Sequence, residues 1–220
     1  MLKPLSYYLS CDKDEILSSF GSIYEHSPWV AEILYDNHLG DKEESITTIR
    51  ELFELMKNIV ESSSDDKKLA LLRVIPDLCE NISNMTNASQ EEQSRAGLQC
   101  LTEGEKDTFL SCNKAYKAKY GFPFILAVRN ASKYTVLSAI RARVHNAKEV
   151  EFITALKQVH KIAWMRLLGA ISIEVPKGFL TCHVLDTANG CPGELKNSHC
   201  CLFWYHFKTH CFSQIIFGSF

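Results

Sequence analysis

The chain has 220 residues, of which 46% are hydrophobic and 23% are charged, and its formal net charge is −2. This composition is typical of a globular protein with a sizeable core, and the near-neutral charge argues against non-specific binding to nucleic acid. No apolar run approaches the ~18 residues of a membrane span, so we do not expect the chain to be an integral membrane protein. The first residues lack the long apolar segment of a signal peptide, and we expect none.

Apolar residues recur at helical spacing through most of the first 170 residues, which predicts a chain of helices. Ser27 and Pro28 fit an N-cap followed by the first helical position. Residues 37–40 should end that helix. Ile75-Pro76 should end a later one, because a residue before proline avoids the α region. In this first half we expect helices over Trp29–Tyr35, Asp41–Val60 and Lys67–Val74.

Further helix starts are predicted by capping motifs in the second half. Ser89-Gln-Glu-Glu92 and Thr102-Glu-Gly-Glu105 both fit the capping-box pattern. The second of these helices should run to Tyr120, with Gly121 just beyond its end. After an apolar run of undefined type over residues 122–128, helices should begin at Ser132 and Asn146. The last helix is expected to bury one face, made of Val150, Ile153, Leu156, Val159 and Ala163.

These elements predict an all-α, multi-helix domain over residues 1–172, and the pattern changes beyond it. Residues 179–186 fit one strand and residues 187–193 a turn. Residues 198–220 are rich in aromatics, Cys and His and have no clear period. We therefore expect a short irregular or β tail. It divides into a linker over 173–180, a strand-bearing fragment over 181–197 and an unassigned remainder over 198–220.

The nine cysteines are unevenly placed along the chain. Four are scattered through the first 180 residues and five lie in residues 181–220. Scattered cysteines without a signal peptide indicate reduced thiols in an intracellular protein. In the tail, His206 and His210 lie near Cys200, Cys201 and Cys211, but this spacing matches no standard zinc pattern. We expect no metal site.

Two features of the helical part have more than one interpretation. Ser89 and Glu92 can simply cap a helix, yet a helix N-terminus also presents unpaired N–H groups that suit a carboxylate-bearing ligand. Arg129 follows an apolar run, where it can clamp an anion bidentately or pair with surface carboxylates. Residue types alone leave both choices open.

Four motifs follow one another in a fixed order. They are Glu25-His-Ser-Pro-Trp-Val-Ala-Glu32, Arg73-Val-Ile-Pro-Asp-Leu78, Ser89-Gln-Glu-Glu-Gln93 with Ala96-Gly-Leu98, and Tyr120-Gly-Phe-Pro-Phe-Ile-Leu-Ala-Val-Arg129. Together they resemble the 2-oxo-4-hydroxy-4-carboxy-5-ureidoimidazoline (OHCU) decarboxylases of urate breakdown, over residues 1–170. The resemblance implies an all-α, often dimeric protein that needs no cofactor. It implies a carboxy-lyase that converts the ureidoimidazoline substrate, a small molecule, to (S)-allantoin.

The resemblance also assigns site residues by position. Pro76 should shape the pocket, and Glu92 is the main polar catalytic candidate. The ureido and carboxylate groups should be held by Ser89, Gln90, Glu91 and Gln93. The ring site should be lined by Phe124, Ile125, Leu126, Ala127 and Val128, with Arg129 as a weaker candidate.

One departure from the family pattern bears directly on catalysis. The family motif is Arg-x-His-Pro-Asp-Leu, whose histidine transfers the proton, and this chain has Ile75 at that position. General acid–base catalysis typically contributes about 10²–10⁴-fold in rate, so a severe loss of rate is expected. A non-catalytic member that binds a ureide or a partner protein, or a degenerate truncated fusion, are the alternatives.

A second, shorter resemblance concerns the tail. Residues 181–192, Thr-Cys-His-Val-Leu-Asp-Thr-Ala-Asn-Gly-Cys-Pro, resemble the first strand of transthyretin-like 5-hydroxyisourate hydrolases, which catalyse the preceding step and are fused to the decarboxylase in some proteins. His183 matches that family's first active-site histidine, but its other motifs have no counterpart. We predict a truncated fragment without hydrolase activity, and a separate hydrolase as pathway partner.

The cellular location is predicted from the last residues. Gly218-Ser-Phe220 is not a peroxisomal signal, so a cytoplasmic location is the default and a peroxisome the alternative.

Overall fold

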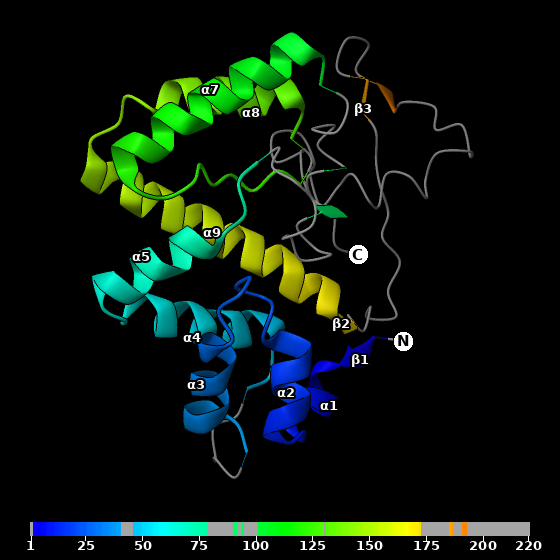
Figure 1. Ribbon diagram of the computed structural model, residues 1–220. Helices are drawn as coiled ribbons and strands as arrows, with labels where there is room; N and C mark the ends of the chain where they lie inside the picture. The colour runs from blue at the N-terminus through cyan, green and yellow to red at the C-terminus, as the bar shows by residue number, and fades with distance from the viewer. Residues whose placement is uncertain are drawn as a thin grey trace. The chain divides into compact units, whose positions relative to one another are not determined.

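Figure 1 shows the computed structural model, which describes residues 2–40, 46–78, 90–91, 94, 101–129, 131–172, 185–186 and 191–192. Its helices are α1 (Leu5–Leu9), α2 (Lys13–Phe20), α3 (Trp29–His38), α4 (Ile49–Glu61), α5 (Asp65–Val74), α7 (Glu103–Tyr120), α8 (Lys133–Arg143) and α9 (Lys148–Ala170). Its short strands are β1 (Lys3–Pro4), β2 (Ile171–Ser172), β3 (Leu185–Asp186) and β4 (Cys191–Pro192). The predicted all-α class is confirmed. Within the described residues, no helix is long and apolar enough to span a membrane.

The chain divides into two compact units, Met1–Glu174 and Val175–Phe220. In the first, β1 pairs with β2 in parallel, with Lys3 opposite Ile171 and Pro4 opposite Ser172. In the second, β3 and β4 are antiparallel, with Leu185 opposite Pro192. The strand predicted over residues 179–186 is described only at Leu185–Asp186, and its remainder lies outside the described residues.

The helix starts show how local capping decides where each element begins. Thr48 and Glu51 form a capping box, so α4 begins at Ile49 and the predicted start at Asp41 is wrong. Residues 41–45 lie outside the described part. Ser64 caps α5, which ends at Val74 as Pro76 predicts. The predicted α3 was too short, because that helix continues to His38, and the residue before its first turn is Pro28 rather than Ser27.

The helix starts predicted at Thr102 and Ser132 are confirmed. Thr102 and Glu105 form the predicted box at the start of α7, and that helix ends at Tyr120 with Gly121 in the left-handed region at φ 78°. Ser132 caps α8. Of the box predicted at residues 89–92, Gln90 and Glu91 are helical, whereas Ser89 and Glu92 lie outside the described residues.

The long helix α9 is the element against which α2, α4, α5 and α7 pack (Figure 1). It begins at Lys148, because the Asn146 side chain donates to Glu151 Oε2 at 2.7 Å instead of capping the helix. The predicted buried face is correct at three positions and wrong at Val150 and Ile153, which are each 53% exposed. The buried face of the helix includes Glu151 in place of Val150 and Ile153. Its members are Glu151, Ala155, Leu156, Val159, His160, Ala163 and Leu167.

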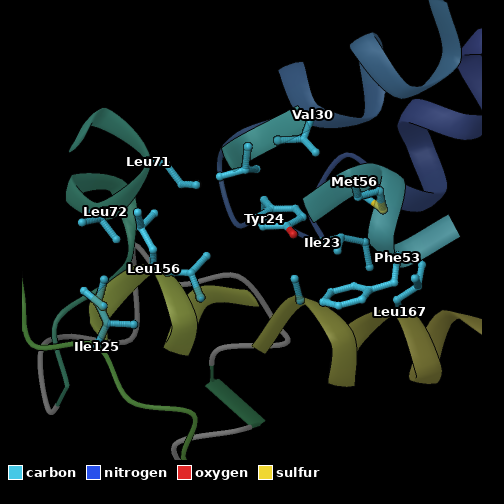
Figure 2. Packing of buried hydrophobic residues seen from close by; sticks show 14 of the residues in the cluster. Ile23, Tyr24, Val30, Phe53, Met56, Leu71, Leu72, Ile125, Leu156 and Leu167 are labelled. Carbon is cyan, nitrogen blue, oxygen red and sulfur yellow. The ribbon is translucent and has the colours of Figure 1, made fainter. Parts of the chain in front are cut away.

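The core runs along both halves of α9, as Figure 2 shows. In one group, Tyr24 lies near Met56 and other side chains of the α2–α3 connection and α4. In the other, Leu72 of α5, Leu156 of α9 and Ile125 approach one another. Burying one such large apolar side chain stabilises the fold by roughly 1.5–3 kcal/mol. Ile125 thereby anchors the otherwise irregular segment 122–129 beside the end of α5.

Candidate active site

Position 75 lies at the end of α5, in backbone that is held on both sides. Ile75 has left the helix, with φ −67° and ψ 128°, and is partly buried like Pro76. Before it, Arg73 Nε donates to the Gly121 carbonyl at 3.1 Å. After it, the buried Asp77 carboxylate accepts a hydrogen bond from Lys117 of α7. The loop is therefore fixed to α7 and to the residue that follows it.

Segment 122–129 is irregular, yet three helices fix its backbone. The Phe124 amide donates to Asn113 Oδ1 of α7 at 3.3 Å. The Ile125 carbonyl accepts from Arg143 Nη1 of α8 at 2.8 Å. The Ala127 amide donates to Gln158 Oε1 of α9 at 3.1 Å. Phe124, Ile125 and Val128 are buried, whereas Leu126 and Ala127 are partly exposed, so the exposed part of the segment lies between anchored ends.

Arg143, which bonds the Ile125 carbonyl of this segment, also forms an ion pair with Glu151. Glu151 is 0% exposed and accepts from Arg143 Nε at 2.9 Å and Nη2 at 2.5 Å. It also accepts from the Tyr116 hydroxyl and from Asn146. Burial, reinforced by the bond to Glu151, raises the pKa of Tyr116, which keeps its hydroxyl protonated as a donor. The Arg143 guanidinium lies 4.6 Å from the Phe124 ring centre, so the same charge pair also contacts the segment's side chains.

Arg129 is partly buried beside α9. Its Nη1 donates to the Met165 carbonyl of α9 at 3.3 Å, so one side of the guanidinium has a backbone partner. Among the other site residues, Gln90 is partly buried and Glu91 is exposed. Ser89, Glu92 and Gln93 lie outside the described residues. The contact between Arg73 and Gly121 joins the end of α5 to the residue that precedes segment 122–129.

Sequence reasoning missed a buried ion pair between the α2–α3 connection and α9. Glu25 Oε2 lies 2.6 Å from Arg166 Nη1, and the two side chains are 0% and 8% exposed. Glu25 also has a positive φ of 55°, which costs energy in a non-glycine residue and persists only where the surroundings impose it. Glu25 belongs to the first of the four family-like motifs, which was the available signal, but its partner is too distant along the chain for a pattern to reveal.

A second unforeseen cluster joins Tyr24, His160 and Glu61. The Tyr24 hydroxyl lies 3.0 Å from His160 Nδ1, and His160 Nε2 lies 2.9 Å from Glu61 Oε1. Burial lowers the pKa of His160 and raises that of Tyr24. A neutral imidazole fits both contacts, since Tyr24 donates to Nδ1 and the Nε2–H donates to Glu61. Across the described residues, no group of three or more His, Cys, Asp or Glu side chains is arranged to hold a metal ion.

The helical domain, with two anchored segments beside α9, matches a known class of protein. The model of the OHCU decarboxylase family matches residues 10–168, and the chain belongs to that family. It is 40% identical to the 2-oxo-4-hydroxy-4-carboxy-5-ureidoimidazoline decarboxylase of Haloferax volcanii over 163 residues, which are 74% of this chain and 93% of the relative.

Two other relatives are informative about domain organisation and fold. The chain is 37% identical to a uric acid degradation bifunctional protein of Bacillus sp. over 153 residues, which are 70% of this chain but only 29% of the relative. The structure of this chain is similar to the crystal structure of (S)-allantoin synthase, with a TM-score of 0.67 and 48% identity. The similarity covers 86% of this chain and 61% of that one.

Proposed function

We propose that this protein decarboxylates 2-oxo-4-hydroxy-4-carboxy-5-ureidoimidazoline to (S)-allantoin, without a cofactor, in urate breakdown. The observation that carries the proposal is the fixed backbone of segment 124–128, which hydrogen bonds from α7, α8 and α9 anchor opposite the end of α5. Membership of the family and 40% identity to a named decarboxylase support the same reaction.

The reaction suits a pocket built of backbone and a few polar side chains. When the bond to the carboxylate breaks, CO2 leaves and the electron pair stays on the ring carbon, where the ring carbonyl and C=N system can hold it. A proton must then reach one face of that carbon. We assign Glu92 as the main catalytic candidate, Pro76 and residues 124–128 to the walls, and Ser89, Gln90, Glu91 and Gln93 to the ureido and carboxylate groups.

Ile75 favours a second candidate function. An isoleucine cannot donate a proton or hydrogen-bond the departing carboxylate, and its backbone is held by the contacts of Arg73 and Asp77. If no other acid replaces the missing group, the same pocket still binds a ureide. The alternative is therefore a non-catalytic member of the family that binds substrate, product or a partner enzyme.

For the second unit we propose a truncated start of a 5-hydroxyisourate hydrolase, with a linker over residues 173–180 and the fragment over 181–197. The likeness of residues 181–192 to that family's first strand supports this, as does a relative named as a bifunctional protein of uric acid degradation. We also propose a 5-hydroxyisourate hydrolase as a pathway partner.

The deciding experiment follows optically active (S)-allantoin by circular dichroism, with substrate generated from urate by urate oxidase and a separate hydrolase. The wild-type chain is compared with Ile75→Val and Ile75→His. Product formation by the wild type above the spontaneous rate supports the enzyme and points to another proton donor. Activity only in Ile75→His, by about 10²–10⁴-fold over wild type, supports the binding protein. No activity in any folded variant rejects the decarboxylase.

A further inference from the structure

Leu126 and Ala127, the partly exposed residues that the proposed function assigns to a wall of the pocket, are positioned by side chains of neighbouring helices. Segment 122–129 has no regular secondary structure, so no ladder of backbone hydrogen bonds sets its course. Its anchors are instead Asn113, Arg143 and Gln158, each from a different helix. The groups that a ligand meets on this wall are therefore set by residues that need not touch the ligand.

These anchors differ in how deeply they belong to the core. Asn113 is buried at 4% exposure, and Arg143 is paired with the fully buried Glu151. Changing either disturbs the packing of α7, α8 and α9 as a whole. Gln158 is only partly buried, and the contact recorded for its side chain within the described residues is the one to the Ala127 amide. It can be altered without removing core side chains or leaving a buried charge.

Two neighbouring backbone bonds explain why the Gln158 contact matters. The Ile125 carbonyl bonds to α8 and the Ala127 amide bonds to α9. Leu126, the residue between them, therefore lies between two backbone groups that side chains hold in place.

We propose that Gln158 is a positioning residue for the site: its Oε1 holds the Ala127 amide and so sets how Leu126 and Ala127 meet the substrate. This inference rests on the proposed function, because it takes segment 124–128 as part of the substrate pocket. Without the acceptor, the Ala127 amide is free to turn, and the neighbouring peptide groups lose their fixed orientation. A small misplacement of binding groups is costly for a bound reactant.

The test compares a variant that removes the acceptor with one that keeps it. Gln158→Met keeps the length and shape of the side chain and removes the acceptor, whereas Gln158→Glu keeps an oxygen that can accept from Ala127. Lys157→Met is the matched control, because Lys157 is the exposed neighbour on the same helix. Three readouts are taken for each: amide hydrogen exchange at Ala127, affinity for (S)-allantoin, and the kcat and KM for its formation. The rates are measured in the wild-type or Ile75→His background, whichever is active.

We expect Gln158→Met to speed exchange of the Ala127 amide by about tenfold, the effect of one lost hydrogen bond, and to lower kcat/KM by about tenfold. Gln158→Glu should keep the slow exchange and most of the kcat, and Lys157→Met should match its background in every readout. Unchanged exchange in Gln158→Met overturns the proposal whatever the activity. Faster exchange with unchanged kinetics and (S)-allantoin affinity also overturns it, because the bond is then merely structural.

The same data separate this proposal from the proposed function. If neither the wild type nor Ile75→His forms or binds (S)-allantoin, the decarboxylase hypothesis and the ureide-binding hypothesis both fail. A functional role for Gln158 then fails with them. If a background is active or binds (S)-allantoin and the Gln158 variants leave that property unchanged, the proposed function stands and the positioning role is overturned.

Discussion

The two halves of α9 bury polar groups in different ways. Near its start, Glu151 is fully buried and is surrounded by donors, including the permanently charged Arg143. Farther along, His160 lies between Tyr24 and the half-exposed Glu61, and burial lowers the pKa of its ring. The first arrangement pairs a buried carboxylate with a guanidinium, whereas the second depends on the imidazole remaining neutral. One helix thus combines a buried ion pair with a titratable contact.

The largest predicted effect on stability comes from breaking the buried ion pair between Arg143 and Glu151. Arg143→Met leaves the Glu151 carboxylate buried without its charged partner, and it removes the donor to the Ile125 carbonyl. We expect a loss of about 3–5 kcal/mol in the free energy of unfolding, measured by urea denaturation. Adding Glu151→Leu should recover much of that loss. A loss below about 1 kcal/mol for Arg143→Met would show that water reaches Glu151 and that the pair is not structural.

A smaller effect is expected at the residue that joins α7 to segment 122–129. Gly121 has φ 78°, and an added Cβ would approach Arg73 Nη2 only to 3.8 Å, an ordinary contact. The cost of Gly121→Ala is therefore that of the left-handed backbone alone, about 1–2 kcal/mol in the free energy of unfolding. Gly121→Asn should cost less, because asparagine tolerates this region better. Equal stability of all three chains in a thermal melt would contradict the assigned backbone conformation.

The smallest effect sharpens the titratable half of the comparison. Burial lowers the pKa of His160, so the unfolded chain, where histidine has a pKa of about 6.5, binds more protons as the pH falls. The stabilisation of the folded chain by the neutral His160 ring is therefore fully present above about pH 6.5, and it is lost as the pH falls through the folded-state pKa of His160. Around the ring, Glu61 and Glu54 favour its protonation, whereas Lys57 opposes it.

The variant that tests this is His160→Gln, followed by urea denaturation between pH 7.5 and 5.5. We expect it to lose about 1 kcal/mol at pH 7.5, because its shorter reach weakens the contacts to Tyr24 and Glu61. Its stability should then vary less with pH than that of the wild type. A variant with the same pH dependence as the wild type would assign the slope to other groups.

Local signals predicted the parts of the fold that local chemistry decides. The capping box at Thr102 and the glycine at 121 gave both ends of α7, and Pro76 gave the end of α5. The predicted face of α9 was wrong at Val150 and Ile153, because hydrophobic periodicity puts charges outside, whereas Glu151 is buried beside Arg143. A pattern of apolar residues contains no information about a paired charge.

The candidate site was found in outline from motifs, but its construction was not. The resemblance named segment 124–128, yet the residues that anchor it are 11, 18 and 31 positions away: Asn113, Arg143 and Gln158. Such contacts form only after helices from distant parts of the chain have packed. The roles given to Ser89, Glu92 and Gln93 stay predictions, because those residues lie outside the described part.

The pairing of β1 with β2 has a consequence for how this domain can be combined with others. Lys3 and Pro4 lie beside Ile171 and Ser172, so the polypeptide enters and leaves the helical domain at neighbouring points. A domain with adjacent entry and exit can be inserted into, or joined to, another polypeptide with little disturbance of its interior. The same property makes it a candidate for circular permutation, in which a short linker joins the two ends and a new opening is cut in a surface loop.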